Sequence, residues 1–484
     1  MGPKTDSTVL VQVAERAMLA KGFVPHPPAE AMAEAERVSP AGAEAGLRDL
    51  RSLPWTSIDN IESQDLDQIE VAEEVAGGVR LMVGIADVSH FVPPGSAIDI
   101  YAANNTVSVY SGVRTFPMLP ERLSFHLSSL LAHEVRPAIV IETIVGDDGA
   151  IGEAKTYLAL VENHAKLDYP SVSAWLDGGP RPAVLDDPAL EAQVRLHDRL
   201  SKTLGAARKK AGAIDVDTAE VRAVVDAHGQ VTRLEQHVQD RAGKIIEELM
   251  VASNRAVAHI LDQAGLPSIR RVVKRPERWA RIVSYAAEHG ATLPAVASSL
   301  SLAQFVDEMR RTRPEQFGEI SLALVKLMGR GEYVAHAPHA PDIGHFGLAT
   351  AEYTHATAPN RRYPDLVTQR SLRALALGQA APYTFDELNT IAQRCSKMEA
   401  EAEKVQRAVQ KSAAAQLLAP SVGHTFDGVV TGAGDKGVFV RLLSPCAEGK
   451  IVKHQEGLAV GQSVRVRLLD VSVEKGFIDF DAIR

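Results

Sequence analysis

The sequence predicts a multidomain α+β protein with three parts: a small helical N-terminal unit (1–47), a large mixed α/β domain (48–417) and a C-terminal OB-fold β-barrel (421–484). Three observations support this fold class. A chain of 484 residues corresponds to about three domains of ordinary size. Apolar residues at 45% and charged residues at 23% are typical of globular proteins. Helix and strand patterns mix in the long middle part, whereas short strand patterns dominate after residue 421.

The N-terminal unit contains two helical patterns. Apolar residues between Val9 and Leu19 suit one helix, which Gly22 and the nearby prolines would end. A helix rich in Ala and Glu is then expected from about Pro28 to Glu36. Two short helices around a turn could form a helix-turn-helix, but we favour a helical hairpin packed on the main domain.

The large domain begins with strands. Residues 80–87 form an apolar run, which predicts a buried strand. Residues 138–145 and 151–161 predict a hairpin, because the sequence Asp-Asp-Gly at 147–149 suits a tight turn.

The domain then becomes helical from about residue 187. Apolar residues recur at helical spacing over 245–261. A last long helix is expected from Phe385 to Leu418, and Pro420 would end it.

The C-terminal part has the pattern of a small barrel. Short β-type runs occur at 437–441 and 463–467, and glycines separate the runs. Several short strands in so short a segment indicate a barrel, most simply an OB-fold.

Composition excludes several classes of protein. The net charge of −9 argues against a polycation that coats nucleic acid, although a local basic channel stays possible. The only two cysteines, Cys395 and Cys446, favour a reducing compartment over a disulfide scaffold. The sequence shows no signal peptide and no apolar run long enough for a bilayer. We therefore expect a cytoplasmic monomer with no membrane partner.

Three aspartates lie close together in one segment: Asp59, Asp65 and Asp67. Asp65 and Asp67 would face the same side of an extended chain. Clustered carboxylates repel unless a cation lies among them, and hard divalent ions such as Mg²⁺ prefer oxygen ligands. Two such ions could bind the attacking water and the leaving oxygen of a phosphodiester. From spacing alone, however, a solvated acidic loop is the more common explanation.

A second cluster contains the adjacent arginines Arg361 and Arg362, just after Pro359 and at the expected start of a helix. The helix dipole disfavours cations there. The arginines make sense if an anion such as a phosphate binds at that end. The alternative is a pair of surface arginines bonded to Asp365 or to the acidic loop.

A third feature is the basic run 270–281, with further cations at 208–210. These side chains could line a nucleic-acid channel. A charge run is more often a solvated face.

Together these residues resemble the ribonuclease II/R (RNB) family. The resemblance rests on six blocks in the family's order: 59–67, 85–99, 108–124, 247–250, 345–348 and 353–370. The segment 428–440 is similar to the OB-fold RNA-binding domain first named in a ribosomal protein, which family members carry after the RNB catalytic domain. Most members also carry two cold-shock barrels before it, and about 47 residues are too few for these.

The resemblance implies a processive 3′→5′ exoribonuclease that hydrolyses single-stranded RNA to nucleoside 5′-monophosphates, with Mg²⁺ as cofactor and Mn²⁺ as a possible substitute. It also implies roles for single residues. The catalytic set would be Asp67, Arg361 and Asp65, and the metal set Asp59, Asp65, Asp67 and Gln68. The RNA-binding set would be Tyr110, Glu247, Arg361, Arg362 and Phe439.

Some positions depart from the family pattern. Gln68 stands where the family usually has Asp, and Ala358 and Asn360 replace its usual Ser and Ile. Gln68 removes a charge from the metal site. An RNA-binding protein of the same fold that is catalytically impaired therefore stays open as an alternative. The missing cold-shock barrels leave a second alternative open, an enzyme able to degrade structured RNA.

Overall fold

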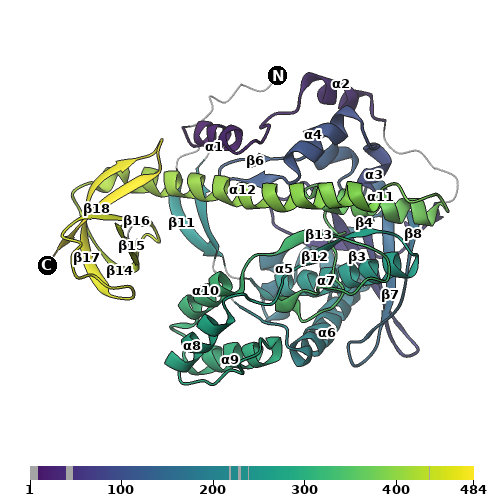
Figure 1. The fold of residues 1–484 in the computed structure, drawn as a ribbon. Helices are drawn as coiled ribbons and strands as arrows, with labels where there is room; N and C mark the ends of the chain where they lie inside the picture. Colours follow the sequence, from purple (N-terminus) through teal and green to yellow (C-terminus); the bar gives the residue numbers. More distant parts are fainter. Residues whose placement is uncertain are drawn as a thin grey trace.

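A seven-stranded sheet forms the centre of the protein in the computed structural model (Figure 1). The structure describes residues 9–39, 47–216, 220–226, 231–237, 239–434 and 437–483. The strand order is β1 (Arg48–Asp49), β8 (Ile151–Glu162), β7 (Val135–Val145), β4 (Gly78–Ala86), β3 (Gln68–Val75), β2 (Thr56–Asp59) and β9 (Ala165–Asp168). The predicted strand at 80–87 and the predicted hairpin at 138–161 are confirmed as β4, β7 and β8.

Helices cover both faces of this sheet. On one face, Leu81, Val83 and Ile85 of β4 pack with α6 (Pro188–Ala211) and α7 (Arg241–Gln263). On the other face, the alternate residues of β4 pack with α4 (Ala97–Asn105) and α11 (Tyr363–Ala376). Because each face is buried from Leu81 onward, β4 is apolar over residues 81–86, without the alternation of a half-exposed strand. The short helices α3 (Val88–Phe91) and α5 (Tyr169–Leu176) follow β4 and β9.

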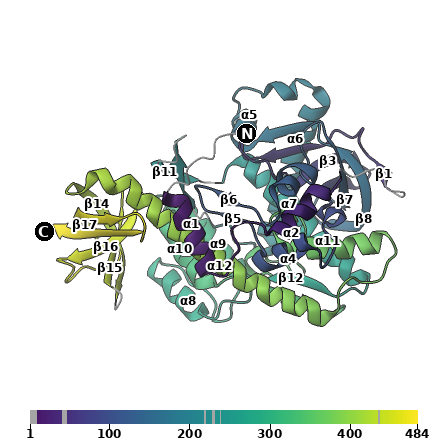
Figure 2. The same cartoon turned by 90° about the horizontal axis from the view of Figure 1, so that it is seen from above.

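The helix α12 (Phe385–Leu418) has the bounds that the sequence predicts. It begins with a capping box between Thr384 and Glu387. It crosses the molecule, with the barrel at its C-terminal end (Figures 1 and 2). Both predicted N-terminal helices are present, and each packs on the main body: α1 (Val9–Ala20) on α12 and α2 (Ala29–Arg37) on α4.

The helical character predicted from about residue 187 is confirmed by α6 (Pro188–Ala211) and later helices, but strands that the sequence did not predict interrupt it in two places. A hairpin of β10 (Glu220–Val225) and β11 (Val231–His237) precedes α7. Farther on, β12 (Ser268–Val272) pairs with β13 (Glu332–His336). The three helices between these strands are α8 (Trp279–Glu288), α9 (Ser299–Thr312) and α10 (Phe317–Met328). A short strand whose partner is some sixty residues away leaves little local signal in the sequence.

The predicted C-terminal barrel is confirmed. It is closed in the order β14 (Thr425–Gly434), β15 (Gly437–Leu442), β16 (Glu448–Lys453), β18 (Phe477–Ile483) and β17 (Ser463–Ser472). A Cβ at Gly449 would lie 2.5 Å from the carbonyl oxygen of Ile478, so only glycine lets β16 approach β18 this closely. Ala414, Ala415 and Leu418 of α12 join the barrel core. Among the described helices we find none with the length and apolarity needed to span a bilayer.

Candidate active site

The acidic segment is the connection between β2 and β3, which are antiparallel neighbours. Asp59 ends β2 and Asp67 lies directly before β3, so the two ends of the connection lie side by side. The side chain of Gln68 lies close enough to Asp59 to help lower the pKa of that carboxyl. Lys166 of β9 donates to the carbonyl oxygens of Ile61 and Ser63, at 3.0 and 2.6 Å. The loop that carries the aspartates is therefore held at both ends and from one side.

Asp67 connects this loop to the segment of Arg361. Asp67 is 2% exposed and accepts a hydrogen bond of 2.9 Å from the backbone N–H of Asn360. Arg361 donates from Nε to the same carboxylate at 3.3 Å. The side chain of Asn360 accepts a bond from Ser128 at 2.6 Å, which holds the turn in place. Two residues almost 300 positions apart in the sequence thus meet in one site.

Tyr110 lies beside the second aspartate. It ends the short strand β5 (Val109–Tyr110), which pairs with β6 (Thr115–Phe116). Its hydroxyl donates to Asp65 at 3.0 Å, while 39% of the residue stays exposed. The backbone N–H of Ser108 donates to the carbonyl oxygen of Arg361 at 2.9 Å. The strand of Tyr110 and the segment of Arg361 are therefore directly joined.

Burial has the largest effect on the pKa values of Asp59 and Asp67. Burial raises the pKa of Asp59 to about 6 and that of Asp67 to about 7, and the charge of Asp65 adds to both shifts. Arg361 opposes the shift at both carboxylates, and Lys166 opposes it at Asp59. Arg361 and Lys166 therefore offset the effects of burial and of the Asp65 charge only in part.

The donors suit a hard divalent cation in their chemistry. All are oxygens, and Oδ2 of Asp59 is buried without a hydrogen-bond partner. In the part of the chain that the structure describes, however, no three acidic, histidine or cysteine side chains converge closely enough to hold a metal ion. The ligands are thus present, but a closed coordination shell is not.

Arg362 has different surroundings from its neighbour. It donates to Oδ1 of the fully buried Asp365 at 2.6 Å. Although burial opposes the charged form, the Asp365 carboxylate raises the pKa of Arg362. Arg362 therefore has the intramolecular partner that the sequence left as an alternative.

Glu247 on α7 also has charged partners. Arg208 and Lys244 contact its carboxylate at 3.0 and 3.1 Å, and Gln239 donates to it at 2.8 Å. Burial raises its pKa, but Lys244, Gln239 and Arg208 together lower it. Glu247 is thus held as a carboxylate, the form that accepts hydrogen bonds from hydroxyl groups.

With this geometry in view, comparison with known proteins identifies the family. A model of the RNB domain matches residues 47–378, and a model of the RNase II-type exonuclease C-terminal S1 domain matches residues 424–483. The chain belongs to the RNB family.

Two curated relatives of this RNB chain are named Ribonuclease R. The protein from Vibrio parahaemolyticus is 31% identical over 92% of this chain and 57% of its own length. The protein from Escherichia coli is 31% identical over 92% of this chain and 58% of its own length. The RNB chain described here therefore spans less than two thirds of either relative.

Solved structures agree with the fold. Mycoplasma genitalium RNase R in complex with ribose methylated single-stranded RNA has a TM-score of 0.88 and 26% identity, covering 98% of this chain and 78% of its own. Yeast Ssd1, a pseudonuclease, has a TM-score of 0.72 at 15% identity, covers 95% of this chain and 58% of its own, and shows the fold alone.

Phe439 lies in the C-terminal barrel of the RNB chain and is far from the aspartates in the sequence. It occupies an outward position of β15, between the buried residues Val438 and Val440. Its neighbours across the sheet are Gly432 on β14 and Lys450 on β16. An aromatic ring beside a lysine on an OB-type barrel is typical of a surface that stacks bases.

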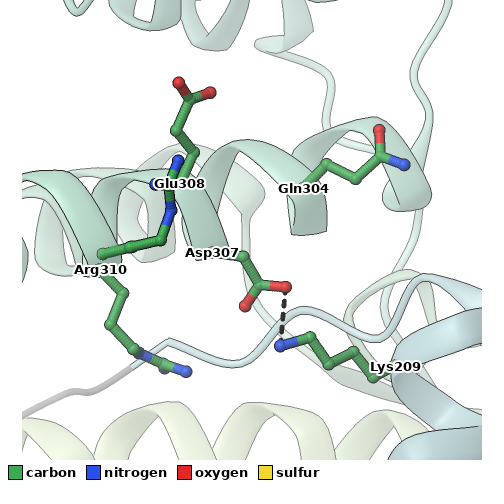
Figure 3. Close-up of a pocket in the computed structure, with 6 residues that line it drawn as sticks. Lys209, Gln304, Asp307, Glu308 and Arg310 are labelled. Carbon is green, nitrogen blue, oxygen red and sulfur yellow. Dashed lines mark ion pairs between the residues drawn. The ribbon is translucent and has the colours of Figure 1, made fainter.

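The predicted basic channel is not a row of free cations. Arg208 contacts Glu247 and Glu248, Lys209 contacts Asp307 at 2.8 Å, and Arg271 contacts Glu399 at 2.6 Å. Figure 3 shows the Lys209 pair in a hollow of about 600 Å³ between α6 and α9. The hollow is lined by charges of both signs: Lys209, Asp307, Glu308, Arg310 and Arg311, with Gln304.

Sequence reasoning missed two contributors to the site, Lys166 and the backbone N–H of Asn360, and it did not single out the buried carboxylate of Glu70. Lys166 lies about a hundred positions from the loop that it holds, and a backbone group has no side-chain signature. Glu70 is two residues beyond Gln68 and therefore on the same face of β3. It is a buried carboxylate in a strand that also contains Gln68, Glu73 and Glu74, so the sequence alone does not single it out.

Proposed function

We propose that this RNB chain is a processive 3′→5′ exoribonuclease that hydrolyses single-stranded RNA to nucleoside 5′-monophosphates. The observation that carries the proposal is the convergence of three aspartates and Arg361 from opposite ends of the domain, joined through Asp67. Relatives named Ribonuclease R and a neighbour solved with single-stranded RNA support it.

Hydrolysis adds water to the phosphorus of the last phosphodiester. The bond from phosphorus to the O3′ of the preceding nucleotide breaks, so a 5′-monophosphate leaves and the shortened RNA keeps a 3′-hydroxyl. Asp59, Asp65 and Asp67, with Gln68, would hold Mg²⁺, which when bound would supply charge stabilisation and an acidified water. Arg361 binds the phosphate and stabilises the negative charge of the transition state. Its Nε contact with Asp67 orients the guanidinium for this role.

Other residues hold the RNA. The exposed ring of Tyr110 stacks on or walls off the terminal base, and its hydrogen bond to Asp65 fixes the ring beside the reacting phosphate. Glu247, kept charged by Lys244 and Arg208, accepts from ribose hydroxyls and so favours RNA over DNA. Phe439 and neighbouring basic side chains bind the strand farther along.

The second candidate is an RNA-binding protein without hydrolysis. The neutral Gln68 favours it, because one carboxylate of the family pattern is missing. Degradation of structured RNA is a further possibility for the active enzyme, and digestion of a duplex with a 3′ overhang tests it.

Asp67→Asn separates the two candidates. The wild-type protein should degrade RNA with Mg²⁺ and stop when EDTA is added. The variant should bind RNA within a few-fold of wild type but lose cleavage, because binding is spread over many phosphates whereas the metal charge is not. Equal cleavage by the variant contradicts the assigned site, and a wild type that binds without cleaving supports the second candidate.

A further inference from the structure

The ribbon of β12 and β13, which lies beside α12 (Figure 1), has three buried polar side chains on one face. Ser268 pairs with His336 across the ribbon, and Arg270 pairs with Val334. Because alternate residues of a strand share a face, Ser268, Arg270 and His336 lie on the same side. They are 4%, 2% and 7% exposed. Within the described part of the chain, the hydroxyl of Ser268, all three guanidinium nitrogens of Arg270 and Nε2 of His336 have no hydrogen-bond partner.

Arg270, the first residue of the basic run 270–281, is the most costly of these groups to bury. A guanidinium is always charged and has only donors, and a buried charge without hydrogen bonds destabilises a fold. Its Nε lies 3.8 Å from Oδ1 of Asp342, which is beyond hydrogen-bond distance. By comparison, the buried Arg370 donates to Asp99 and to the carbonyl oxygen of Val92, both at 2.7 Å. The donors of Arg270 are therefore available to an acceptor from outside the chain.

Arg270 and His336 line a cavity of about 200 Å³. The rest of its lining is apolar, and it includes Ile343 and Phe385, which are 55% and 43% exposed. Sites for drug-sized ligands measure roughly 300–1,000 Å³. The cavity therefore suits a smaller molecule, with a polar group at the ribbon and an apolar part toward solvent.

Acidic side chains lie near the same cations. Asp262 and Asp342 each have an oxygen 3.8 Å from Nε2 of His336. Burial lowers the pKa of Arg270, and Asp342, Glu352 and Asp262 oppose this shift only in part. Among the residues that the structure describes, no three acidic, histidine or cysteine side chains are arranged to bind a metal ion. Unused donors, which need an acceptor, therefore define this site.

We propose that the cavity binds a small organic anion. The oxygens of its phosphate or carboxylate group accept hydrogen bonds from Arg270, because a guanidinium suits such groups in a bidentate geometry. His336 is a second donor, and the apolar part of the ligand packs against Ile343 and Phe385. None of these residues belongs to the proposed active site, so the inference does not depend on the proposed function.

Matched probes test the inference on the wild-type chain. Phenyl phosphate and benzoate present the two charged groups on an aromatic ring, and benzamide is the neutral counterpart of benzoate. Calorimetry with EDTA present should show millimolar or tighter binding of at least one anion, and benzamide should bind about tenfold more weakly or worse. Binding of one anion only supports the inference and identifies the charged group. Binding of neither anion, or equally tight binding of benzamide, overturns it.

Three variants locate the binding. Arg270→Met should weaken anion binding by about tenfold or more. It should melt at a temperature no lower than wild type, because an apolar group is less costly to bury. Asp342→Asn removes a repelling carboxylate and should tighten binding. The control is Arg361→Ala, in the proposed active site, which should bind the anion as wild type does.

The same variants give the results that would contradict the inference. Wild-type affinity in a folded Arg270→Met protein overturns it. Weaker binding by Asp342→Asn also overturns it, since that carboxylate would then be part of the ligand's site. Loss of binding in Arg361→Ala assigns the anion to the active site and overturns the inference, while the proposed function stands.

Discussion

Arg361 and Arg362 are adjacent in the chain, yet their side chains have different surroundings. The side chain of Arg361 is 43% exposed and contacts Asp67, whereas that of Arg362 is 20% exposed and bonds a carboxylate, Asp365, that is 0% exposed. A charge that binds substrate has to be accessible, and a charge that pairs a buried carboxylate does not. We therefore expect one arginine to serve the reaction and the other to serve the fold.

Alanine substitution should separate these roles. Arg361→Ala should lower the single-turnover rate by about 10²–10³-fold, the usual effect of losing a transition-state donor, with little change in stability. Arg362→Ala leaves the buried Asp365 without a charged partner and should reduce the free energy of unfolding by about 3 kcal/mol or more. Urea unfolding and single-turnover cleavage, measured on both proteins, check this. The reverse pattern would show that the two roles are exchanged.

Tyr110 should determine where degradation stops. A stacked base contributes about 1–3 kcal/mol. This is a small part of the binding free energy of a long RNA but a large part of the binding free energy of a short remnant. Tyr110→Ala should therefore keep the rate on long RNA within roughly tenfold, while longer end products accumulate on gels. Tyr110→Phe keeps the ring and loses only the bond to Asp65, so its end products should lie closer to those of wild type than the end products of Tyr110→Ala do. A wild-type ladder from a folded Tyr110→Ala protein would exclude the stacking role.

At the residue scale, the sequence could predict the acids and the arginine but not their partners. Asp59, Asp65, Asp67 and Arg361 belong to recognisable motifs, and the structure brings them together. The contact of Lys166 with the loop depends on β9 lying parallel to β2. Such pairing depends on the whole sheet, and no short motif encodes it.

Among the elements, α6 contains a buried histidine that makes stability depend on pH. His197 is 1% exposed, and Nε2 has no hydrogen-bond partner. Burial lowers its pKa from 6.5 to about 4. Between these values the unfolded chain binds a proton that the folded chain does not, so this residue makes the protein less stable as the pH falls below 6.5.

His197→Leu should remove this dependence. Relative to the variant, wild type should lose about 2 kcal/mol of unfolding free energy from His197 between about pH 7.5 and pH 5. The comparison isolates His197 from the aspartates, whose raised pKa values act in the opposite direction. Urea unfolding at the two pH values provides the measurement, with the exposed His126→Leu as control. Equal slopes for wild type and His197→Leu would contradict the assigned pKa.

Elements with strong local patterns were predictable, and those defined by distant partners were not. The 34 residues of α12 carry a capping box and a sustained helical pattern, and the β7–β8 hairpin carries its own turn sequence. By contrast, β12 and β13 are five residues each and pair across three helices. Their strand conformation follows from tertiary pairing, which local propensity does not determine.

At the scale of the whole molecule, the barrel is attached through a shared core. Ala414, Ala415 and Leu418 of α12 lie in the barrel's hydrophobic cluster. Removal of residues 421–484 would therefore expose part of α12 as well as delete the proposed RNA-binding surface of the barrel. Surface substitution tests the role of the barrel more cleanly than truncation.

Phe439→Ala should weaken binding of single-stranded RNA by about 1–3 kcal/mol, the contribution of one stacked base. The single-turnover rate at saturating enzyme should not change, because the barrel does not contribute to the aspartate site. Phe477→Ala, a residue 58% exposed on β18, is the matched control and should bind RNA as wild type does. A fall in the saturated rate for Phe439→Ala would show that the barrel acts on the chemistry.

The direction and product of cleavage test the central claim most directly. One single-stranded RNA is labelled at its 5′ end in one sample and at its 3′ end in another, and both are digested with Mg²⁺ and with EDTA. We predict that the 3′ label is released at once as a nucleoside 5′-monophosphate. The 5′ label should appear in a short end product, without fragments of intermediate length. Neither change should occur in the sample with EDTA. Early release of the 5′ label, internal fragments, or binding without any cleavage would contradict the account.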